Sequence, residues 1–468
     1  MSNELVLDTR FRAALRRMRD AQRLQAVTGA VSTEYEIASM MKQLDGGPAL
    51  LFNDVVGHNL PIVGNLLCCR ENVEAAFGTD FRVLRTFISR ALGNPIEPIE
   101  VQHAPAQQVV LKTGFDLGSL LPVLRHAPGD GGRFITAGVV ICRDPESGVC
   151  NASYHRLQVM GPDRLAIKLD YGRHLRLAFE RAQKNGEALP IAICLGTDIA
   201  LQYTAATMGS QLPENMDELA VAGGLSGRAL PIVQGITVPL PVPAETEIVL
   251  EGFIQPSETV SEGPFGEFVG FAAPAAPAPV IVVSAVTHRR RPIYPAINGY
   301  GRETVMLRKY VLEASLLKAV QPAVPIVVDA DMTAGGLHRF HAILQVKKTL
   351  PTHEGLQRNA ILAAFGALKD LDLVIVVDDD IDIRDWNDVE YALATRMEAS
   401  RDLIVIPEAR GHEYVRAGRN GIRAKLGIDA TVPPEERERF TRVAFAPVEI
   451  DRHRLCFDRE EIDRSLME

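Results

Sequence analysis

The sequence carries near its middle the heptapeptide Ser261-Glu262-Gly263-Pro264-Phe265-Gly266-Glu267, in which two glutamates flank a Gly-Pro-Phe-Gly turn. Proline fixes its own φ and glycine removes the Cβ barrier, so this pattern predicts a rigid, tight loop. Such a loop can hold Glu262 and Glu267 close together. Because two converging carboxylates cannot both ionise cheaply, one of them tends to keep a proton near neutral pH and can serve as a general acid. The alternative interpretation is an exposed acidic turn between two strands.

The regions on both sides of this loop have the pattern of short strands. From about residue 106 to 300, apolar and β-branched runs alternate with Gly, Pro and Asp turns. The runs are Phe134–Cys142, Ala152–Met160, Leu165–Leu169, Ile191–Cys194, Ile248–Ile254 and Val280–Thr287. One helical pattern, His174–Lys184, interrupts them, and the Ala/Pro segment Ala272–Pro279 indicates a stiff connector. The region therefore predicts an antiparallel, barrel-like sheet.

Helical and strand patterns alternate in the two flanking regions. The N-terminal region has helical patterns at Glu36–Leu44 and Val73–Leu92 and strand patterns at Ala49–Phe52 and Leu60–Leu67. The C-terminal region has helical patterns at Val305–Val320, Glu354–Leu368 and Trp386–Arg396, and strand patterns at Pro325–Val328, His341–Val346, Leu371–Val377 and Leu403–Pro407. We predict a mixed α/β (α+β) protein with an N-terminal α/β domain (1–105), a central β domain (106–300) and a C-terminal α/β domain (301–468).

Composition and charge limit the classes of function. The chain has 468 residues, a net charge of −9 at pH 7, 47% hydrophobic residues and 23% charged residues, which is typical of a soluble globular protein. The negative charge argues against nucleic acid as a partner. No apolar run approaches the roughly 18 residues that span a bilayer. The cysteines form no Cys-x-x-Cys pair and no signal peptide is present, so we expect a cytoplasmic protein with reduced, mostly buried thiols. The cysteines are Cys68, Cys69, Cys142, Cys150, Cys194 and Cys456.

Two groups of polar residues are candidates for a metal site. Asp378-Asp379-Asp380 follows an apolar strand pattern, where α/β sheets place ligands, and clustered carboxylates can bind Mg²⁺ or Mn²⁺. The same run can equally be a solvated strand end. The second group combines Asn151, His174 and Glu218, an amide, an imidazole and a carboxylate, which suits Mn²⁺ or Mg²⁺ better than zinc. Spacing alone leaves either group open to a purely structural role.

The chain resembles the UbiD-type reversible decarboxylases, which use prenylated FMN. The resemblance covers nearly the whole chain in the right order. It rests on Asn151–Arg156, Tyr171–His174, Asp217–Gly224, Val242–Gly252, Glu262–Glu267, Val376–Met397 and Lys425–Thr431. It implies that the central domain is a split β-barrel similar to flavin reductases.

The resemblance also assigns roles to individual residues. It makes Asn151, His174 and Glu218 the ligands of a Mn²⁺ ion that bridges the protein and the cofactor phosphate, with K⁺ as a further candidate ion. Arg156, Glu262 and Glu267 become a Glu-Arg-Glu catalytic network in which Glu267 donates the proton. The cofactor-binding residues become Asn151, Ser153, Tyr154, His155, Arg156, Arg173, His174, Met208, Glu218 and Lys425. One spacing is unexpected: residues 151 and 156 are five apart, which places them on opposite faces of a regular strand. Either Asn151 precedes the strand or a bulge reorients one of the two residues.

The predicted function is therefore the reversible, non-oxidative decarboxylation of an aromatic, heteroaromatic or α,β-unsaturated carboxylic acid. The partners implied are that acid, CO₂ and a flavin prenyltransferase that supplies the cofactor. Phe268, next to Glu267, can stack against a flat ring, and Leu337–Phe340 can face the same site. By resemblance we expect a homodimer or higher homo-oligomer, with C-terminal helices such as Val305–Val320 at the interface. Two alternatives are a Mn²⁺-dependent nucleotide-sugar transferase that uses Asp378–Asp380, and an inactive flavin-binding scaffold.

Overall fold

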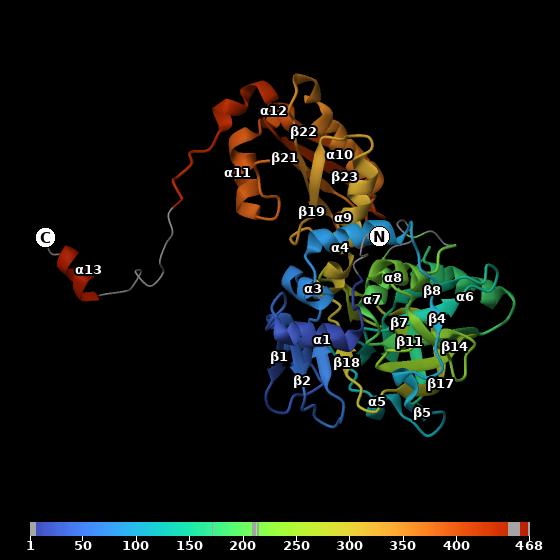
Figure 1. Cartoon of the computed structure of the whole chain (residues 1–468). Coiled ribbons are helices and arrows are strands. Elements are labelled where there is room, and N and C mark those ends of the chain that lie inside the picture. Colours follow the sequence, from blue (N-terminus) through green and yellow to red (C-terminus); the bar gives the residue numbers. More distant parts are fainter. Residues whose placement is uncertain (1–5, 171, 208–211, 213–214, 448–458, 467–468) are drawn as a thin grey trace.

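The structure is a computed structural model that describes residues 6–170, 172–207, 212, 215–447 and 459–466. The N-terminal and central regions lie side by side, and the C-terminal sheet with its helices lies over them (Figure 1). The predicted mixed α/β class is confirmed. The domain limits at residues 105 and 300 stay a prediction.

The N-terminal region is built on a four-stranded sheet with the order β1-β2-β3-β18. Its strands are β1 (Leu24–Val27), β2 (Ala49–Phe52), β3 (Ile62–Gly64) and β18 (Tyr294–Ala296), and its helices are α1 (Phe11–Asp20), α2 (Glu36–Gln43), α3 (Arg70–Phe77) and α4 (Phe81–Ala91). The single helical pattern predicted at 73–92 is two helices. Gly78, at φ +71°, ends α3, and the Asp80 side chain caps α4.

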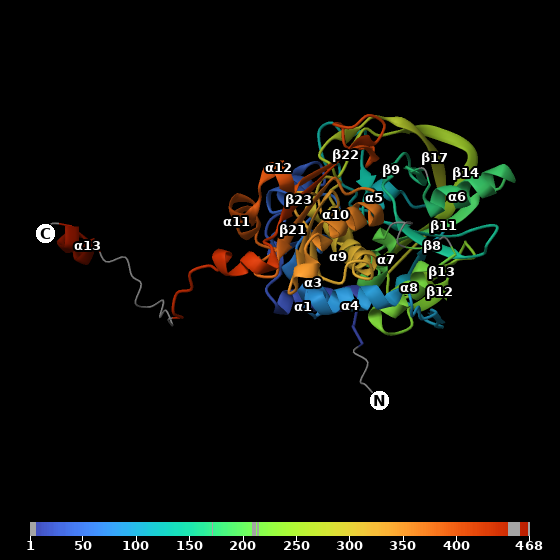
Figure 2. The ribbon, with the colours of Figure 1, turned by 90° about the horizontal axis from the view of Figure 1, so that it is seen from above.

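The central region is a nine-stranded sheet with the order β6-β9-β10-β17-β14-β11-β7-β8, to which β5 adds by pairing with β17. The strands are β5 (Val109–Leu111), β6 (Phe134–Ile135), β7 (Val139–Arg143), β8 (Cys150–Tyr154), β9 (Leu157–Val159), β10 (Arg164–Ile167), β11 (Leu189–Leu195), β14 (Ile248–Glu262) and β17 (Ala276–His288). All its pairs are antiparallel. Register shifts in the β14–β17 pair accompany the curl of the sheet (Figure 2). The predicted antiparallel, barrel-like sheet is confirmed.

Three helices and two small sheets complete the central region. The helices are α6 (His174–Lys184), α7 (Ile199–Ala206) and α8 (Glu218–Ser226); the small sheets pair β4 (Ile99–Glu100), β12 (Pro231–Gln234) and β13 (Pro241–Pro243), and β15 (Phe265–Gly266) with β16 (Ala272–Ala273). The prediction of a connector at Ala272–Pro279 is wrong, because β16 and the start of β17 occupy this segment. Proline's fixed φ is compatible with an extended backbone, so the prolines do not prevent strand formation.

The C-terminal region is a five-stranded mixed sheet with the order β19-β20-β21-β23-β22. Its strands are β19 (Val327–Met332), β20 (His341–Val346), β21 (Leu373–Asp378), β22 (Leu403–Arg410) and β23 (Ile422–Ala430), and its helices include α9 (Arg302–Val320), α10 (Leu356–Ala367), α11 (Trp386–Arg396), α12 (Ala399–Asp402) and α13 (Arg459–Leu466). β20, β21 and β23 run parallel, and the two outer strands are antiparallel to their neighbours. The sequence pattern predicted every strand of this sheet except β23.

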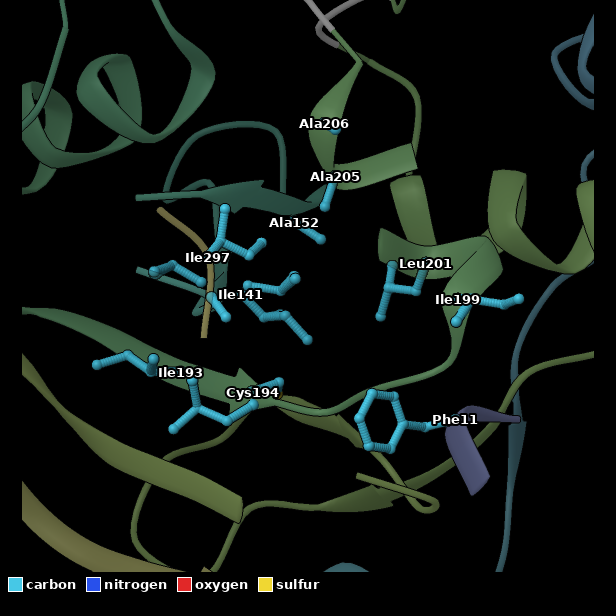
Figure 3. Packing of buried hydrophobic residues seen from close by; sticks show 14 of the residues in the cluster. Phe11, Ile141, Ala152, Ile193, Cys194, Ile199, Leu201, Ala205, Ala206 and Ile297 are labelled. Carbon is cyan, nitrogen blue, oxygen red and sulfur yellow. The ribbon is translucent and has the colours of Figure 1, made fainter. Parts of the chain in front are cut away.

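One hydrophobic core unites the N-terminal and central regions. Phe11 of α1 lies close to Ile199 of α7, and Ile141 and Ile193 of the central sheet belong to the same cluster (Figure 3). The C-terminal region has its own two clusters. Helix α9 contributes to both parts, since Tyr310 belongs to the first core and its later residues belong to the second. The apolar side chains of α9 are thus used within the chain and are not free to form the predicted subunit interface.

The described cysteines are free thiols, four of them buried and Cys69 half-buried, as predicted; Cys456 lies outside the described residues. Among the helices that the structure describes, none has the length and apolar character to cross a membrane.

Glu251 should be a major determinant of stability in the central sheet. Its side chain is fully buried on β14 and accepts hydrogen bonds from the backbone N–H groups of Ile236 (2.8 Å) and Thr237 (2.5 Å) and from the Thr237 hydroxyl (2.9 Å). In Glu251→Gln an NH₂ group replaces one acceptor, so at least one buried donor loses its partner at a cost of about 1–3 kcal/mol. Calorimetry should show a lower midpoint of thermal unfolding, whereas Glu187→Gln, at an exposed position of the central region, should leave it unchanged.

Candidate active site

Three side chains from different elements converge beside the central sheet. Asn151 lies on β8, His174 is the first residue of α6, and Glu218 is the first residue of α8. Asn151 Nδ2 lies 2.6 Å from Glu218 Oε1 and 3.5 Å from His174 Nδ1, and His174 Nδ1 lies 3.8 Å from Glu218 Oε1. The structure therefore brings together the three residues predicted as metal ligands.

The position of Arg156 resolves the unexpected spacing from Asn151. β8 ends at Tyr154 and β9 begins at Leu157, so Arg156 lies in the break between the two strands. Asn151 lies within β8, opposite Cys142 of β7. Neither proposed explanation is correct, because the alternation of faces stops at the end of the strand before Arg156 is reached.

The environment of Glu218 fits a cation. Its side chain is buried, and burial raises its pKa, although hydrogen bonds from His174 and the Ala152 backbone oppose this effect. A divalent cation would replace the missing solvation of this carboxylate. No set of three or more His, Cys, Asp or Glu side chains converges among the described residues, and this triad supplies an amide as its third donor. The mixed oxygen and nitrogen donors, within 4 Å of one another, fit Mn²⁺ or Mg²⁺ once the Asn151 amide turns its oxygen inward.

The second group of charges surrounds Arg156. Its Nε and Nη2 each donate a 2.8 Å hydrogen bond to Glu262, at the end of β14, and its Nη1 donates a 2.5 Å bond to Glu267. Burial tends to lower the pKa of Arg156, but the hydrogen bond and charge of Glu262 outweigh this and raise it. Glu262 is 1% exposed, so the interpretation of its loop as an exposed acidic turn is wrong. The loop instead directs both carboxylates onto one guanidinium.

Three residues that the sequence analysis did not single out extend this group. Lys168, just after β10, donates from Nζ to Glu267 Oε1 at 2.8 Å and to the Tyr414 hydroxyl at 2.9 Å. The Tyr414 hydroxyl in turn donates to Asp170 Oδ1 at 3.3 Å. Lys168 and Asp170 stand near His174 in sequence, which is a weak signal. Tyr414 has no local signal, because it comes from the loop between β22 and β23, 246 residues after Lys168.

Aromatic rings and arginines lie next to Glu267. Phe268 stacks on Phe340 with ring centroids 6.1 Å apart, and the Arg339 guanidinium lies 5.3 Å from the Phe268 ring centroid. Arg339 is paired with Asp370. Arg308 of α9 has a buried Nε without a hydrogen-bond partner and forms no ion pair among the described residues. Burial and the positive charges of Arg339 and Arg173 lower the pKa of Arg308 to about 9, so this cation lacks compensation.

The remaining predicted cofactor residues have different surroundings. Ser153 Oγ lies 3.1 Å from Asn151 Oδ1 and 3.1 Å from His155 Nε2, so both flank the metal triad. Tyr154 donates to Gln202 (3.3 Å), and Arg173 directly precedes α6 with no hydrogen bond or ion pair within the described part of the chain. Met208 lies outside the described residues.

Lys425 is engaged within the C-terminal sheet. Its Nζ donates to the carbonyls of Lys369 (2.8 Å) and Leu371 (2.5 Å). The structure thus gives it a structural role there and shows no contact between it and the metal triad. Its role as a phosphate contact stays a prediction.

The acidic run Asp378–Asp380 is occupied by arginines. Arg396 donates to Asp378 (2.9 Å) and Asp380 (2.6 Å), and Arg437 pairs with Asp379. These ion pairs neutralise the carboxylates that a nucleotide-sugar transferase would need for its metal. The run therefore joins α11 and the segment after β23 to the end of β21.

Comparison with known proteins agrees with this arrangement. Models of the N-terminal, Rift-related and C-terminal domains of 3-octaprenyl-4-hydroxybenzoate carboxy-lyase match residues 15–91, 98–301 and 305–430. The chain is 34% identical to gallate decarboxylase from Lactiplantibacillus plantarum, over 86% of this chain and 87% of that protein. It is 35% identical to anhydromevalonate phosphate decarboxylase from Methanothermobacter thermautotrophicus, over 89% of this chain and 96% of that protein.

A solved structure has the same fold over nearly the whole chain. The UbiD-class enzyme HmfF from Pelotomaculum thermopropionicum, in complex with FMN, superposes with a TM-score of 0.89 at 39% identity, covering 93% of this chain and 97% of that chain. An evolved dimeric form of HmfF in complex with prFMN superposes with a TM-score of 0.83 at 36% identity, covering 95% and 98%. These matches support the decarboxylase interpretation over the transferase and inactive-scaffold alternatives. The chain belongs to the UbiD family of carboxy-lyases.

Proposed function

We propose that this protein is a reversible, non-oxidative decarboxylase that uses prenylated FMN and acts through Arg156, Glu262 and Glu267. The observation that carries the proposal is the pairing of one buried guanidinium with two glutamates, beside a triad that suits a divalent cation. Loss of CO₂ from an sp² carbon leaves a carbanion that no side chain can stabilise. The prenylated flavin supplies the electron-accepting chemistry when bound.

The cofactor would be held at its phosphate end. Asn151, His174 and Glu218 would hold Mn²⁺, whose charge would attract the cofactor phosphate, with K⁺ as a further candidate ion. The N-terminus of α6 supplies free backbone N–H groups beside this site, and Arg173 adds a positive charge. Ser153, Tyr154 and His155 would lie along the cofactor.

Proton transfer would be the task of the three charged residues. Decarboxylation of a carboxylate consumes one proton, because the carbon that loses CO₂ gains hydrogen. Arg156 would orient the substrate carboxylate, Glu262 would balance the charge of Arg156, and Glu267 would hand its proton to that carbon. In the reverse direction Glu267 would take the proton back. A flavin prenyltransferase would supply the cofactor, and we propose a cytoplasmic homo-oligomer.

Replacing Glu218 should empty the metal site without unfolding the protein. Glu218→Ala removes the only ligand of the triad that carries a full negative charge. Metal analysis and flavin absorbance of the protein produced with a flavin prenyltransferase should both fall well below wild type, and Glu187→Ala, at an exposed position, should retain both. Wild-type metal and flavin levels in Glu218→Ala would remove this residue from the site.

Replacing Glu267 should stop proton transfer while leaving the cofactor bound. Glu267→Gln keeps the shape of the side chain but removes the transferable proton, so turnover should fall by roughly 10²–10⁴-fold. Cofactor loading should persist, because the metal triad does not include Glu267. Turnover normalised to bound flavin is the measurement, with Glu187→Gln, at an exposed position, as the control. A fully loaded Glu267→Gln enzyme with near-normal turnover would contradict the role of proton donor.

The surroundings of Glu267 indicate the class of substrate. Phe268 and Phe340 can pack against a planar ring. Arg308 has no ion-pair partner among the described residues and lies one helical turn from Val305, which packs in the same aromatic cluster. Arg156 already serves the carboxylate that is lost. We infer that the substrate is an aromatic or heteroaromatic acid with a second anionic group, which Arg308 binds.

This substrate class predicts a preference for diacids that depends on Arg308. The wild-type enzyme should have a higher kcat/KM for terephthalate than for benzoate, and for thiophene-2,5-dicarboxylate than for thiophene-2-carboxylate. Arg308→Gln should lower kcat/KM for the diacids by at least about 30-fold and leave that for the monoacids unchanged. Lys318→Gln, on the same helix, is the control. For any acid that does not turn over, the dissociation constant from calorimetry replaces kcat/KM. Equal effects of Arg308→Gln on diacids and monoacids would contradict the inference.

A further inference from the structure

Lys168 joins the catalytic carboxylate to the C-terminal region. Its Nζ lies 2.8 Å from Glu267 Oε1, 2.9 Å from the Tyr414 hydroxyl and 3.9 Å from Asp170 Oδ1. Glu267 belongs to the central loop, whereas Tyr414 belongs to the segment between β22 and β23. The lysine is thus the point at which the C-terminal region touches the charges around Glu267.

Two cations bind the side chain of Glu267. Oε1 of Glu267 accepts both the Lys168 bond and the 2.5 Å bond from Arg156. The other charged or titratable groups around this pair are Glu262, which is bound to Arg156, and Tyr414 with Asp170, which face Lys168. Arg156 also donates two hydrogen bonds to Glu262, whereas Lys168 binds Glu267 and not Glu262.

This arrangement matters for a residue that must give up a proton. A general acid is protonated before the transfer and negatively charged after it. A lysine ammonium at hydrogen-bond distance stabilises the charged product of the transfer, so it strengthens the acid. It also lowers the pH up to which the acid keeps its proton. Lys168 therefore strengthens the acid but narrows the pH range in which the enzyme is active.

Tyr414 determines where Lys168 lies. The Lys168 side chain is 27% exposed and could extend into solvent, but the Tyr414 hydroxyl holds its Nζ against Glu267. The Tyr414 ring lies in turn against His412, with ring centroids 5.0 Å apart, and Phe268, with centroids 6.2 Å apart. The position of the lysine thus depends on the packing of the C-terminal loop on the central loop.

We propose that Lys168 is a positioning residue that, held by Tyr414, sets the pH range over which Glu267 donates its proton. The proposal rests on Glu267 being the proton donor. It couples the placement of the C-terminal region to the chemistry, because displacement of Tyr414 releases Lys168 from the site.

The test is the pH dependence of kcat and kcat/KM in Lys168→Met, Lys168→Arg and Tyr414→Phe holoenzymes. Activity requires protonated Glu267, so it falls as pH rises past the point where Glu267 ionises. Removing a cation at hydrogen-bond distance should move this alkaline limb upward by about one to three pH units in Lys168→Met. Lys168→Arg should keep the limb at the wild-type pH, and Tyr414→Phe should move it in the same direction by less. The exposed Lys184→Met is the control.

The outcomes separate this proposal from the proposed function. If Glu267→Gln is inactive and the limb of Lys168→Met stays at the wild-type pH, the positioning role is overturned and the proton donor stands. If Glu267→Gln keeps its turnover, the donor assignment itself fails. A loss of activity in Lys168→Met that is equal at every pH also overturns the proposal, since a merely structural lysine would give that result. Flavin content, measured for each variant, confirms that the compared enzymes are equally loaded.

Discussion

A guanidinium removed from solvent requires negatively charged partners, and this constraint explains how the centre of the protein is built. Arg156 can be buried only because Glu262 and Glu267 reach it from the far end of β14 and from the loop beyond. The loop must therefore turn tightly, and β8 must end before Arg156 so that the side chain can leave the strand. The long antiparallel hairpin of β14 and β17, the break between β8 and β9, and the short β15–β16 pair all serve this one contact.

The second organising feature is the convergence of helix starts. Glu218 and His174 are the first residues of α8 and α6, and both face Asn151 on β8. α7 and α8 are buried almost throughout, which fixes Glu218 against the sheet without help from the surface. The helix dipole places partial positive charge at these same ends, which suits an anion, whereas the Glu218 carboxylate suits a metal cation. The metal triad, through Asn151, and the group of charges around Arg156 are thus both built on β8 and the segment that follows it.

Local pattern predicted local structure well and tertiary contacts poorly. α6, β20 and α11 were predicted to the residue because their apolar periodicity is undisturbed. β23 was missed because its buried positions Lys425, Gly427 and Asp429 are not apolar, so the sequence shows no apolar alternation there. The interpretation of Lys425 as a phosphate contact did not consider its hydrogen bonds to neighbouring carbonyls. The sequence pattern singled out the two glutamates and the triad as candidates, and the resemblance to a family assigned their roles. Lys168, Tyr414 and Arg308 carry no motif, and only the fold brings them together.

The pairing of β18 with β3 has a consequence for folding of the protein during its synthesis on the ribosome. β3 pairs with β2 on one edge and with β18 on the other. β3 ends at Gly64, but β18 begins only at Tyr294. Throughout synthesis of the intervening chain, β3 presents an unpaired edge of backbone donors and acceptors to the solvent. Such edges invite pairing with other nascent chains, and contacts so distant in sequence form slowly. The N-terminal sheet can close only late in translation, so production at lower temperature or with chaperones should favour the native product.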